Sequence, residues 1–183
     1  MNNIEALLEQ VRAAAAESEN LQDPIDSKSL ADAEQKLGFR LPPLLAALYA
    51  TVGNGGFGPN DALLELCDAD PSDGTDTALG EYLTLAIPGG TDPWWRWPAG
   101  VLPILDWGCG RLACVDCQSE DETVLLFEPN AIEGEYVAAA WFVDSPSLAD
   151  WLQTWLDGRG WYEADLDDDV SDMQPWSDAA SRL

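Results

Sequence analysis

The chain has 183 residues, of which 46% are hydrophobic, so it can bury one sizeable core and is not a wholly disordered chain. Its 34 acidic and 8 basic residues give a formal net charge of −26, which repels nucleic-acid backbones and anionic membrane surfaces and favours a basic protein partner. Because there is no histidine, Ser-His-Asp catalysis, Cys-His catalysis and histidine metal sites are excluded. The alternative is that the charge serves solubility or a saline habitat.

The N-terminal residues do not resemble a secretion signal, because acidic side chains stand where a basic start and an apolar run are needed. The longest apolar run, 137–143, is far shorter than the roughly 20 residues that span a bilayer. We therefore expect a cytoplasmic protein with reduced cysteines and no membrane partner.

The sequence pattern of the first 56 residues predicts three helices. Apolar residues recur at helical spacing from Asn3 to about Ser18 and indicate the first helix. The second is expected over 29–37, where Ser29 and Asp32 have the spacing of a capping box.

Residues 37–59 end the second helix and form the third. Gly38 can take the left-handed conformation that closes a helix, and Pro42 and Pro43 suit the first turn of the next one. The glycine-rich turn 53–56 then ends the third helix. This turn lacks the Lys-Ser/Thr of a phosphate loop and closes a helix instead of opening one, so we interpret it as structural.

The region 60–100 is rich in turns. An acidic stretch, 68–77, predicts an exposed loop, and 63–66 and 82–87 are possible strands. Another loop at 88–93 leads into three closely spaced tryptophans at 94, 95 and 97.

After Gly100 the pattern favours β-structure. Apolar runs at 101–107, 111–117, 123–127 and 136–143 are separated by short turns, which is typical of an antiparallel meander. A last helix is expected to begin at Ser145-Pro146 and to end at Gly158. The prediction is an α+β domain over residues 1–160, with N-terminal helices, a central antiparallel sheet of about four to six strands and a closing C-terminal helix. Residues 161–183 would form an acidic C-terminal extension.

Several motifs occur in a set order along this pattern. Leu-Gly and Leu-Pro precede an Asn-Gly-Gly turn, Leu-Pro-Ile and Trp-Gly-Cys-Gly follow at 102–110, and Cys-Val-Asp-Cys and Ser-Leu-Ala-Asp-Trp-Leu follow at 114–117 and 147–152. Over about residues 25–158 the chain resembles the SUKH superfamily, which contains the fungal Smi/Knr-type cell-wall-assembly regulators and many bacterial immunity proteins. The signature positions, with a structural role, are Leu37, Gly38, Leu41, Pro42, Asn54, Gly55, Gly56 and Gly58.

The resemblance implies a fold without catalysis, so neither catalytic residues nor a cofactor is expected. Its bacterial members are implied to bind and neutralise polymorphic toxins, many of them nucleases or other nucleic-acid-directed enzymes. The acidic loop, the tryptophans and the acidic tail lie outside the signature. An acidic surface would suit the basic cleft of such a toxin. Candidate partner-binding residues are Asp68, Asp70, Asp73, Asp76, Trp94, Trp95, Trp97, Glu120, Asp121 and Glu122.

Other interpretations remain open. The protein could be a regulatory scaffold of the cell-wall-assembly type, or a carboxylate-based hydrolase that uses its tryptophans to stack sugars. The four cysteines at 67, 109, 114 and 117 could hold zinc, but only one Cys-x-x-Cys pair is present, so buried apolar cysteines are favoured. The acidic loop could bind calcium, but it lacks the final glutamate of an EF-hand, so a solvated loop is favoured.

Overall fold

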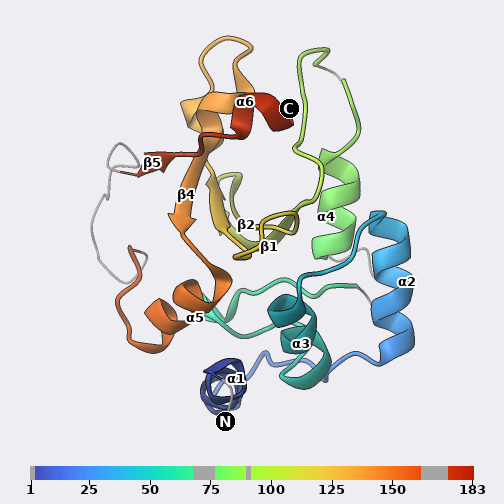
Figure 1. The fold of residues 1–183 in the computed structure, drawn as a ribbon, viewed down its shortest axis with the longest axis vertical. Helices are drawn as coiled ribbons and strands as arrows, with labels where there is room; N and C mark the ends of the chain where they lie inside the picture. The colour runs from blue at the N-terminus through green and yellow to red at the C-terminus, as the bar shows by residue number, and fades with distance from the viewer. Residues whose placement is uncertain (1–2, 68–76, 90–91, 162–172) are drawn as a thin grey trace.

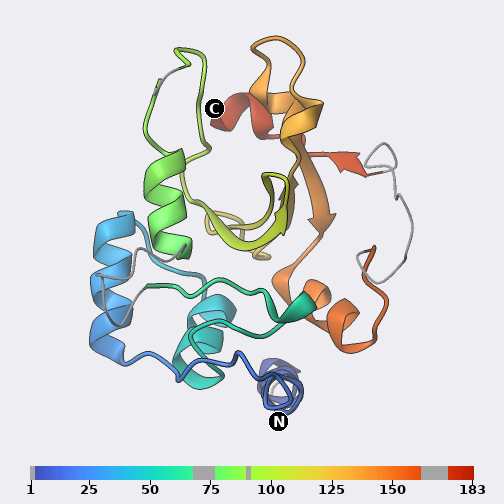
Figure 2. The ribbon, with the colours of Figure 1, turned by 180° about the vertical axis from the view of Figure 1, so that it is seen from behind.

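A computed structural model describes residues 3–67, 77–89, 92–161 and 173–183, and confirms the α+β fold (Figure 1). Helices packed at one end of the long axis are joined to a central sheet, and loops with a short helix form the opposite end (Figures 1 and 2). The N-terminus and the C-terminus therefore lie at opposite ends of the molecule. The helices are α1 (Asn3–Ala15), α2 (Ser27–Leu37), α3 (Pro43–Thr51), α4 (Ala78–Leu85), α5 (Leu148–Leu156) and α6 (Ala179–Arg182).

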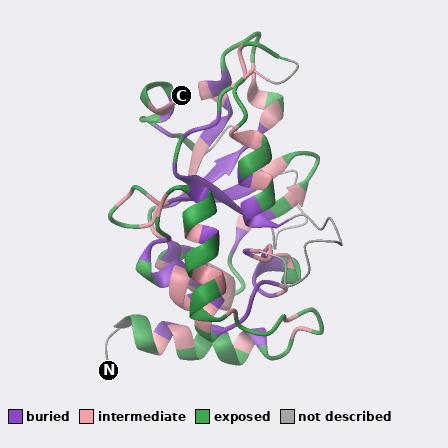
Figure 3. Ribbon diagram, turned by 90° about the vertical axis from the view of Figure 1, so that its right-hand side faces the viewer, coloured by how far each residue is buried: buried purple, intermediate pink, exposed green. Residues whose placement is uncertain are grey.

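The sheet is antiparallel throughout, and its strands stand in sequence order. The two central strands are almost entirely buried, as Figure 3 shows, and the rings of Trp95 and Trp97 pack against Phe127 of the second of them. No helix in the described part of the chain combines the length and apolar character needed to cross a membrane. The strands are β1 (Val101–Gly108), β2 (Arg111–Asp116), β3 (Val124–Phe127), β4 (Trp141–Ser145) and β5 (Gln174–Pro175).

The Asn-Gly-Gly turn joins the helical end to the sheet. The side chain of Asn54, which is 5% exposed, accepts a hydrogen bond from the Leu66 N–H at 2.9 Å and donates one to the Cys67 carbonyl at 3.0 Å. Gly56 has a φ of +72°, and a Cβ at this position would lie 1.9 Å from the carbonyl oxygen of Asn20. Glycine therefore lets the segment after α1 pass against the turn. The structure supports a packing role for this turn.

The strand predicted over 82–87 is wrong, because this region belongs to helix α4. Thr77 caps the helix by accepting a hydrogen bond from the Gly80 N–H at 3.0 Å, and Leu79 and Tyr82 face the core. The run 82–87 has the length of a strand, but the helical spacing begins earlier, at 78, directly after the acidic loop. The other possible strand, 63–66, is only a single antiparallel bridge between Leu63 and Leu105.

Several predicted boundaries also need correction. Strand β4 begins at Trp141 and not at 136, since residues 137–140 form a 3₁₀ helix, η3 (Val137–Ala140). Three consecutive alanines there lack the branched side chains that favour strands. Helix α5 has Ser147 as its N-cap, two residues beyond the predicted start, and its hydroxyl accepts from the Asp150 N–H at 3.0 Å. Helix α2 is capped by Asp26, ahead of the predicted Ser29. The first helix ends at 15 instead of 18.

The last residues of the chain pack against the domain. Strand β5 pairs with β4 in the register Phe142–Pro175 and Val143–Gln174. Trp176 is 7% exposed and belongs to the main hydrophobic core. The sequence places 161–183 in an extension, and within it residues 174–175 form an edge strand of the sheet while Trp176 enters the core.

Candidate protein-binding site

A surface pocket of about 160 Å³ lies at the loop end of the molecule, opposite α1. It is formed where the segment before β1, the segment around η3 and the C-terminal helix α6 come together (Figure 1). Its lining combines aromatic, aliphatic and a few charged side chains, which is the usual composition of a recognition site. We call this the rim pocket, and its residues are Trp94, Arg96, Glu135, Tyr136, Val137, Ala138, Ala180 and Leu183.

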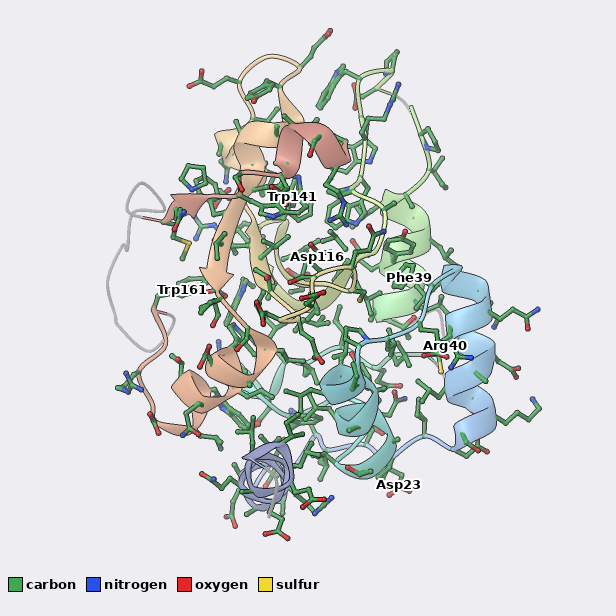
Figure 4. All side chains as sticks on the ribbon, in the orientation of Figure 1. Asp23, Phe39, Arg40, Asp116, Trp141 and Trp161 are labelled. Atoms are coloured by element: carbon green, nitrogen blue, oxygen red, sulfur yellow. The ribbon has the colours of Figure 1, made fainter. Side chains whose placement is uncertain are left out.

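A ladder of aromatic rings supports the floor of the rim pocket. Trp94 packs edge-on against Trp95 with ring centroids 6.3 Å apart, and the Trp95 indole N–H donates to the Leu85 carbonyl at 2.8 Å. Trp97 packs against Trp141 at 4.8 Å, and Trp141 packs against Trp176 at 5.9 Å. Trp141 is the first residue of β4, and Figure 4 shows it near the C-terminal segment. These rings fix the three surface segments relative to one another.

The C-terminal wall of the pocket is held by one buried ion pair. The guanidinium of Arg182 makes two 3.1 Å contacts with the carboxylate oxygens of Asp116 and donates to the Ala99 carbonyl at 2.7 Å. Asp116 is 4% exposed, and the guanidinium also lies 5.4 Å from the centroid of the Trp176 ring. The fork geometry and the low exposure make this a strong, directional contact.

Acidic side chains surround the pocket. Asp92, Glu133, Glu135 and Asp178 are exposed on the segments that form it. Arg96, the basic residue of the lining, donates to the backbone carbonyls of Pro93 at 2.9 Å and Trp95 at 2.7 Å. These hydrogen bonds orient the guanidinium but leave its positive charge in place. The four exposed acids outnumber this arginine, so the charge balance around the pocket is negative.

The three predicted tryptophans have different environments. Trp94 lines the rim pocket and is half-buried, whereas Trp95 is half-buried behind it. Trp97 is 8% exposed, and its indole N–H donates to the Val101 carbonyl at 2.8 Å. The core contains Trp97, so we place only Trp94 at the proposed contact surface.

The predicted acidic residues do not gather at this pocket. Glu120 and Asp121 are exposed in the β2–β3 turn, and Glu122 reaches α3, where its carboxylate accepts from the Leu44 N–H at 3.1 Å. This carboxylate caps a helix start that has no cap of its own. Desolvation raises the pKa of Glu122. The other four acids, Asp68, Asp70, Asp73 and Asp76, lie outside the described residues.

Tyr136 and the C-terminal residues are members of the pocket that sequence reasoning missed. Tyr136 is 60% exposed, the highest value among the large apolar side chains of the described chain, and it lies next to Glu135. Its only signal in the sequence is a single aromatic residue between acidic and small residues. The other two contributors, Ala180 and Leu183, carry no local signal.

A second and larger depression, of about 370 Å³, lies at the end of α2. It is lined in part by Glu34, Phe39 and Arg40, and Figure 4 shows Phe39 and Arg40 at the end of this helix. The Glu34 carboxylate accepts from the Leu41 N–H at 3.0 Å, and the Phe39 ring packs edge-on against Tyr82 at 5.2 Å. These side chains hold the turn between α2 and α3, so this depression is the weaker candidate.

The cysteines do not form a metal site in the described part of the chain, where no three His, Cys, Asp or Glu residues are grouped for a metal ion. Cys114 is buried and Cys109 is exposed. Burial raises the pKa of the Cys114 and Cys117 thiols, and the neighbouring Asp116 raises that of Cys117 further. Both thiols are therefore protonated at neutral pH in the metal-free chain and are poor nucleophiles there.

Asp144 is a titratable group that sequence reasoning missed. Its two carboxylate oxygens accept hydrogen bonds from the indole N–H groups of Trp151 at 3.0 Å and Trp161 at 3.2 Å. Burial raises the pKa of Asp144 to about 6, although both hydrogen bonds lower it. Figure 4 shows Trp161 beside β4, away from the rim pocket.

Comparison with curated proteins gave no match. The sequence profile of the SMI1 / KNR4 family (SUKH-1) matches residues 24–154, which is more than half of the chain. The match extends from the segment before α2 to α5 and includes the Asn-Gly-Gly turn, the first four strands and Trp94. The chain therefore belongs to the SMI1 / KNR4 family (SUKH-1).

Proposed function

We propose that this protein is a cytoplasmic immunity protein that binds and neutralises a basic toxin domain, and that it acts by binding and not by catalysis. The toxin would be a nuclease or another nucleic-acid-directed enzyme, whose substrate cleft is positively charged. Family membership supports a binding role, and the surface charge supports the sign of the partner.

The observation that carries this proposal is the imbalance of charge at the surface. Among the residues that the structure describes, ion pairs engage Lys28, Arg111, Arg159 and Arg182. Exposed acids, by contrast, occur on α1, in the β2–β3 turn, around the rim pocket and on α5. A potential of one sign over most of the surface accelerates encounter with a basic protein and repels nucleic acid.

The test is affinity capture from the native cell, followed by titration of the captured protein with the purified chain. We expect one basic enzyme, bound with nanomolar affinity and inhibited at one to one stoichiometry. Several weak partners without enzymatic activity would instead support the alternative, a regulatory scaffold of the cell-wall-assembly type. Capture of an acidic protein alone would contradict the proposal.

A matched pair of charge variants locates the contact. The rim variant carries three substitutions around the rim pocket, Glu133→Gln, Glu135→Gln and Asp178→Asn. The control variant loses the same number of charges at and just after α1, through Glu9→Gln, Glu17→Gln and Glu19→Gln. All six side chains are exposed. We expect the rim variant to lose at least about ten-fold in affinity and the other variant to lose about two-fold or less. Equal losses would place the contact elsewhere.

A further inference from the structure

We propose that the rim pocket accepts one large apolar side chain, of the Phe or Leu class, that a protein partner presents between lysine or arginine residues. The partner class follows from the proposed function, but the recognition chemistry follows from the pocket itself and can be tested without the toxin.

The floor of the rim pocket is apolar. Trp94, Tyr136, Val137 and Leu183 supply aromatic and aliphatic surface within a volume of about 160 Å³, which suits one side chain and not an extended segment. Tyr136 is 60% exposed, so apolar surface is left in water when the protein is alone. Covering such surface is favourable in proportion to the apolar area removed from water.

Acidic side chains surround this floor. Asp92, Glu133, Glu135 and Asp178 are exposed on the segments that form the pocket. Arg96 donates both its contacts to carbonyls of its own loop. An apolar residue flanked by acids would be repelled here, whereas one flanked by lysine or arginine would gain attraction as well as burial.

Contacts within the domain hold two walls of the pocket in place without a partner. Packing of Trp95 against Phe127 at 6.0 Å, and of Trp97 against Phe127 at 5.2 Å, ties one wall to the sheet. The ion pair between Arg182 and Asp116 ties the other wall to β2. A preformed pocket loses little conformational entropy on binding. A second copy of this chain is a poor occupant, because two molecules with a formal charge of −26 repel each other.

Three blocked pentapeptides test the inference by NMR, namely Lys-Lys-Phe-Lys-Lys, Lys-Lys-Gly-Lys-Lys and Glu-Glu-Phe-Glu-Glu. We expect the first to shift the Trp94 indole and the methyl resonances of Ala138, Ala180 and Leu183, with affinity about ten-fold tighter than the second. The second should give only diffuse shifts at acidic sites, and the third should give none.

A filled-pocket variant supplies the control. Ala180→Phe introduces a ring from an exposed position in α6, and Ala13→Phe introduces the same ring in α1 at the other end. The ten-fold preference for phenylalanine should disappear in the first variant and persist in the second. Equal binding of the lysine peptides to the wild type, or a preference that survives Ala180→Phe, would overturn the inference.

Two further results separate this inference from the proposed function. If the phenylalanine preference is present but no basic enzyme is captured from cells, the pocket stands and the immunity role fails. If a toxin binds tightly and Ala180→Phe leaves its dissociation rate unchanged, the role stands and the inference fails. Dimerisation in sedimentation experiments that Ala180→Phe abolishes would show a second copy as the occupant and would also overturn it.

Discussion

Asp144 links the end of β4 to two tryptophans, and it makes stability depend on pH. Its pKa is raised from 3.8 to about 6 by burial, so between these values the folded chain holds a proton that the unfolded chain releases. Below pH 3.8 the carboxyl is protonated in both states, and its contribution to the free energy of unfolding is fully present. This contribution is lost as the pH rises from 3.8 through about 6. The loss amounts to roughly 3 kcal/mol at most, from about 1.4 kcal/mol per pKa unit.

The variant Asp144→Asn should therefore flatten the pH dependence of the free energy of unfolding between pH 4 and pH 6.5. Urea unfolding at several pH values measures it, with Asp121→Asn, an exposed acid, as the control. The variant itself can be less stable at all pH values, because an amide cannot accept from both indoles. The informative quantity is the slope of the free energy of unfolding against pH. Equal slopes in the wild type and the variant would rule out this role for Asp144.

Gly56 shows the effect of a close backbone approach on a single residue. A Cβ in Gly56→Ala would lie 1.9 Å from the Asn20 carbonyl oxygen, whereas a Cβ in Gly134→Ala would have no atom within 4 Å. Both glycines have positive φ, +72° and +64°, so both variants share the backbone strain. Measured by urea unfolding, the free energy of unfolding should fall by about 1 kcal/mol in Gly134→Ala and by roughly 3 kcal/mol or more in Gly56→Ala. Equal costs would mean that the turn relaxes and does not depend on the close approach.

At the scale of elements, Arg182 controls how the C-terminal segment attaches. Arg182→Ala leaves the carboxylate of Asp116 without its guanidinium, so undocking of β5 and α6 becomes the way to rehydrate it. We expect Arg182→Ala to show faster amide exchange in residues 176–183 and a red shift of tryptophan fluorescence. Its free energy of unfolding should be about 2 kcal/mol lower than that of the wild type.

Arg159→Ala is the matched control for this clamp. Its ion pair with Asp157 is exposed, with 66% and 39% of the two side chains accessible, so its loss should cost less than about 0.5 kcal/mol. Unchanged exchange in residues 176–183 of Arg182→Ala would show that ring packing alone holds the segment.

The elements also show which parts of the fold were accessible from sequence. The stretch around Gly38 and Pro42 was predicted because its stop and start signals are contiguous. Helix α4 was missed because its first turn follows directly on the acidic loop and its second half reads as a strand. The sequence indicates Glu122 only as a candidate partner-binding residue. The structure shows in addition that it caps α3 across 78 residues of chain, a relation that no local pattern contains.

The rim pocket could not be predicted for the same reason. The sequence indicates Trp94 as a candidate, whereas Tyr136 and Leu183 reach the pocket only through pairing of distant segments in the sheet. Trp97 was grouped with its neighbours because sequence spacing alone does not tell which ring enters the core. Functional residues that are close together in the sequence can therefore be predicted, whereas a site formed by distant segments that the fold brings together cannot.

At the scale of the whole molecule, the net charge opposes the compact state. With 34 acidic and 8 basic residues, the folded chain repels itself, and salt screens this repulsion. The thermal midpoint should rise by several degrees as NaCl increases from about 0.01 M to 0.2 M, as followed by circular dichroism. Potassium chloride at the same ionic strength should act equally, which separates screening from binding of a particular cation. A midpoint that is flat or falls would show that ion pairs outweigh the repulsion.

The same charge is the basis of the central claim, that this protein binds a basic partner through an acidic surface. The association rate of the captured partner, measured by stopped flow at a series of ionic strengths, tests it most directly. We expect the rate to fall at least ten-fold from about 0.02 M to 0.5 M salt, and to fall further when Glu133, Glu135 and Asp178 are neutralised. An association rate that is independent of salt and unaffected by the rim variant would contradict the claim.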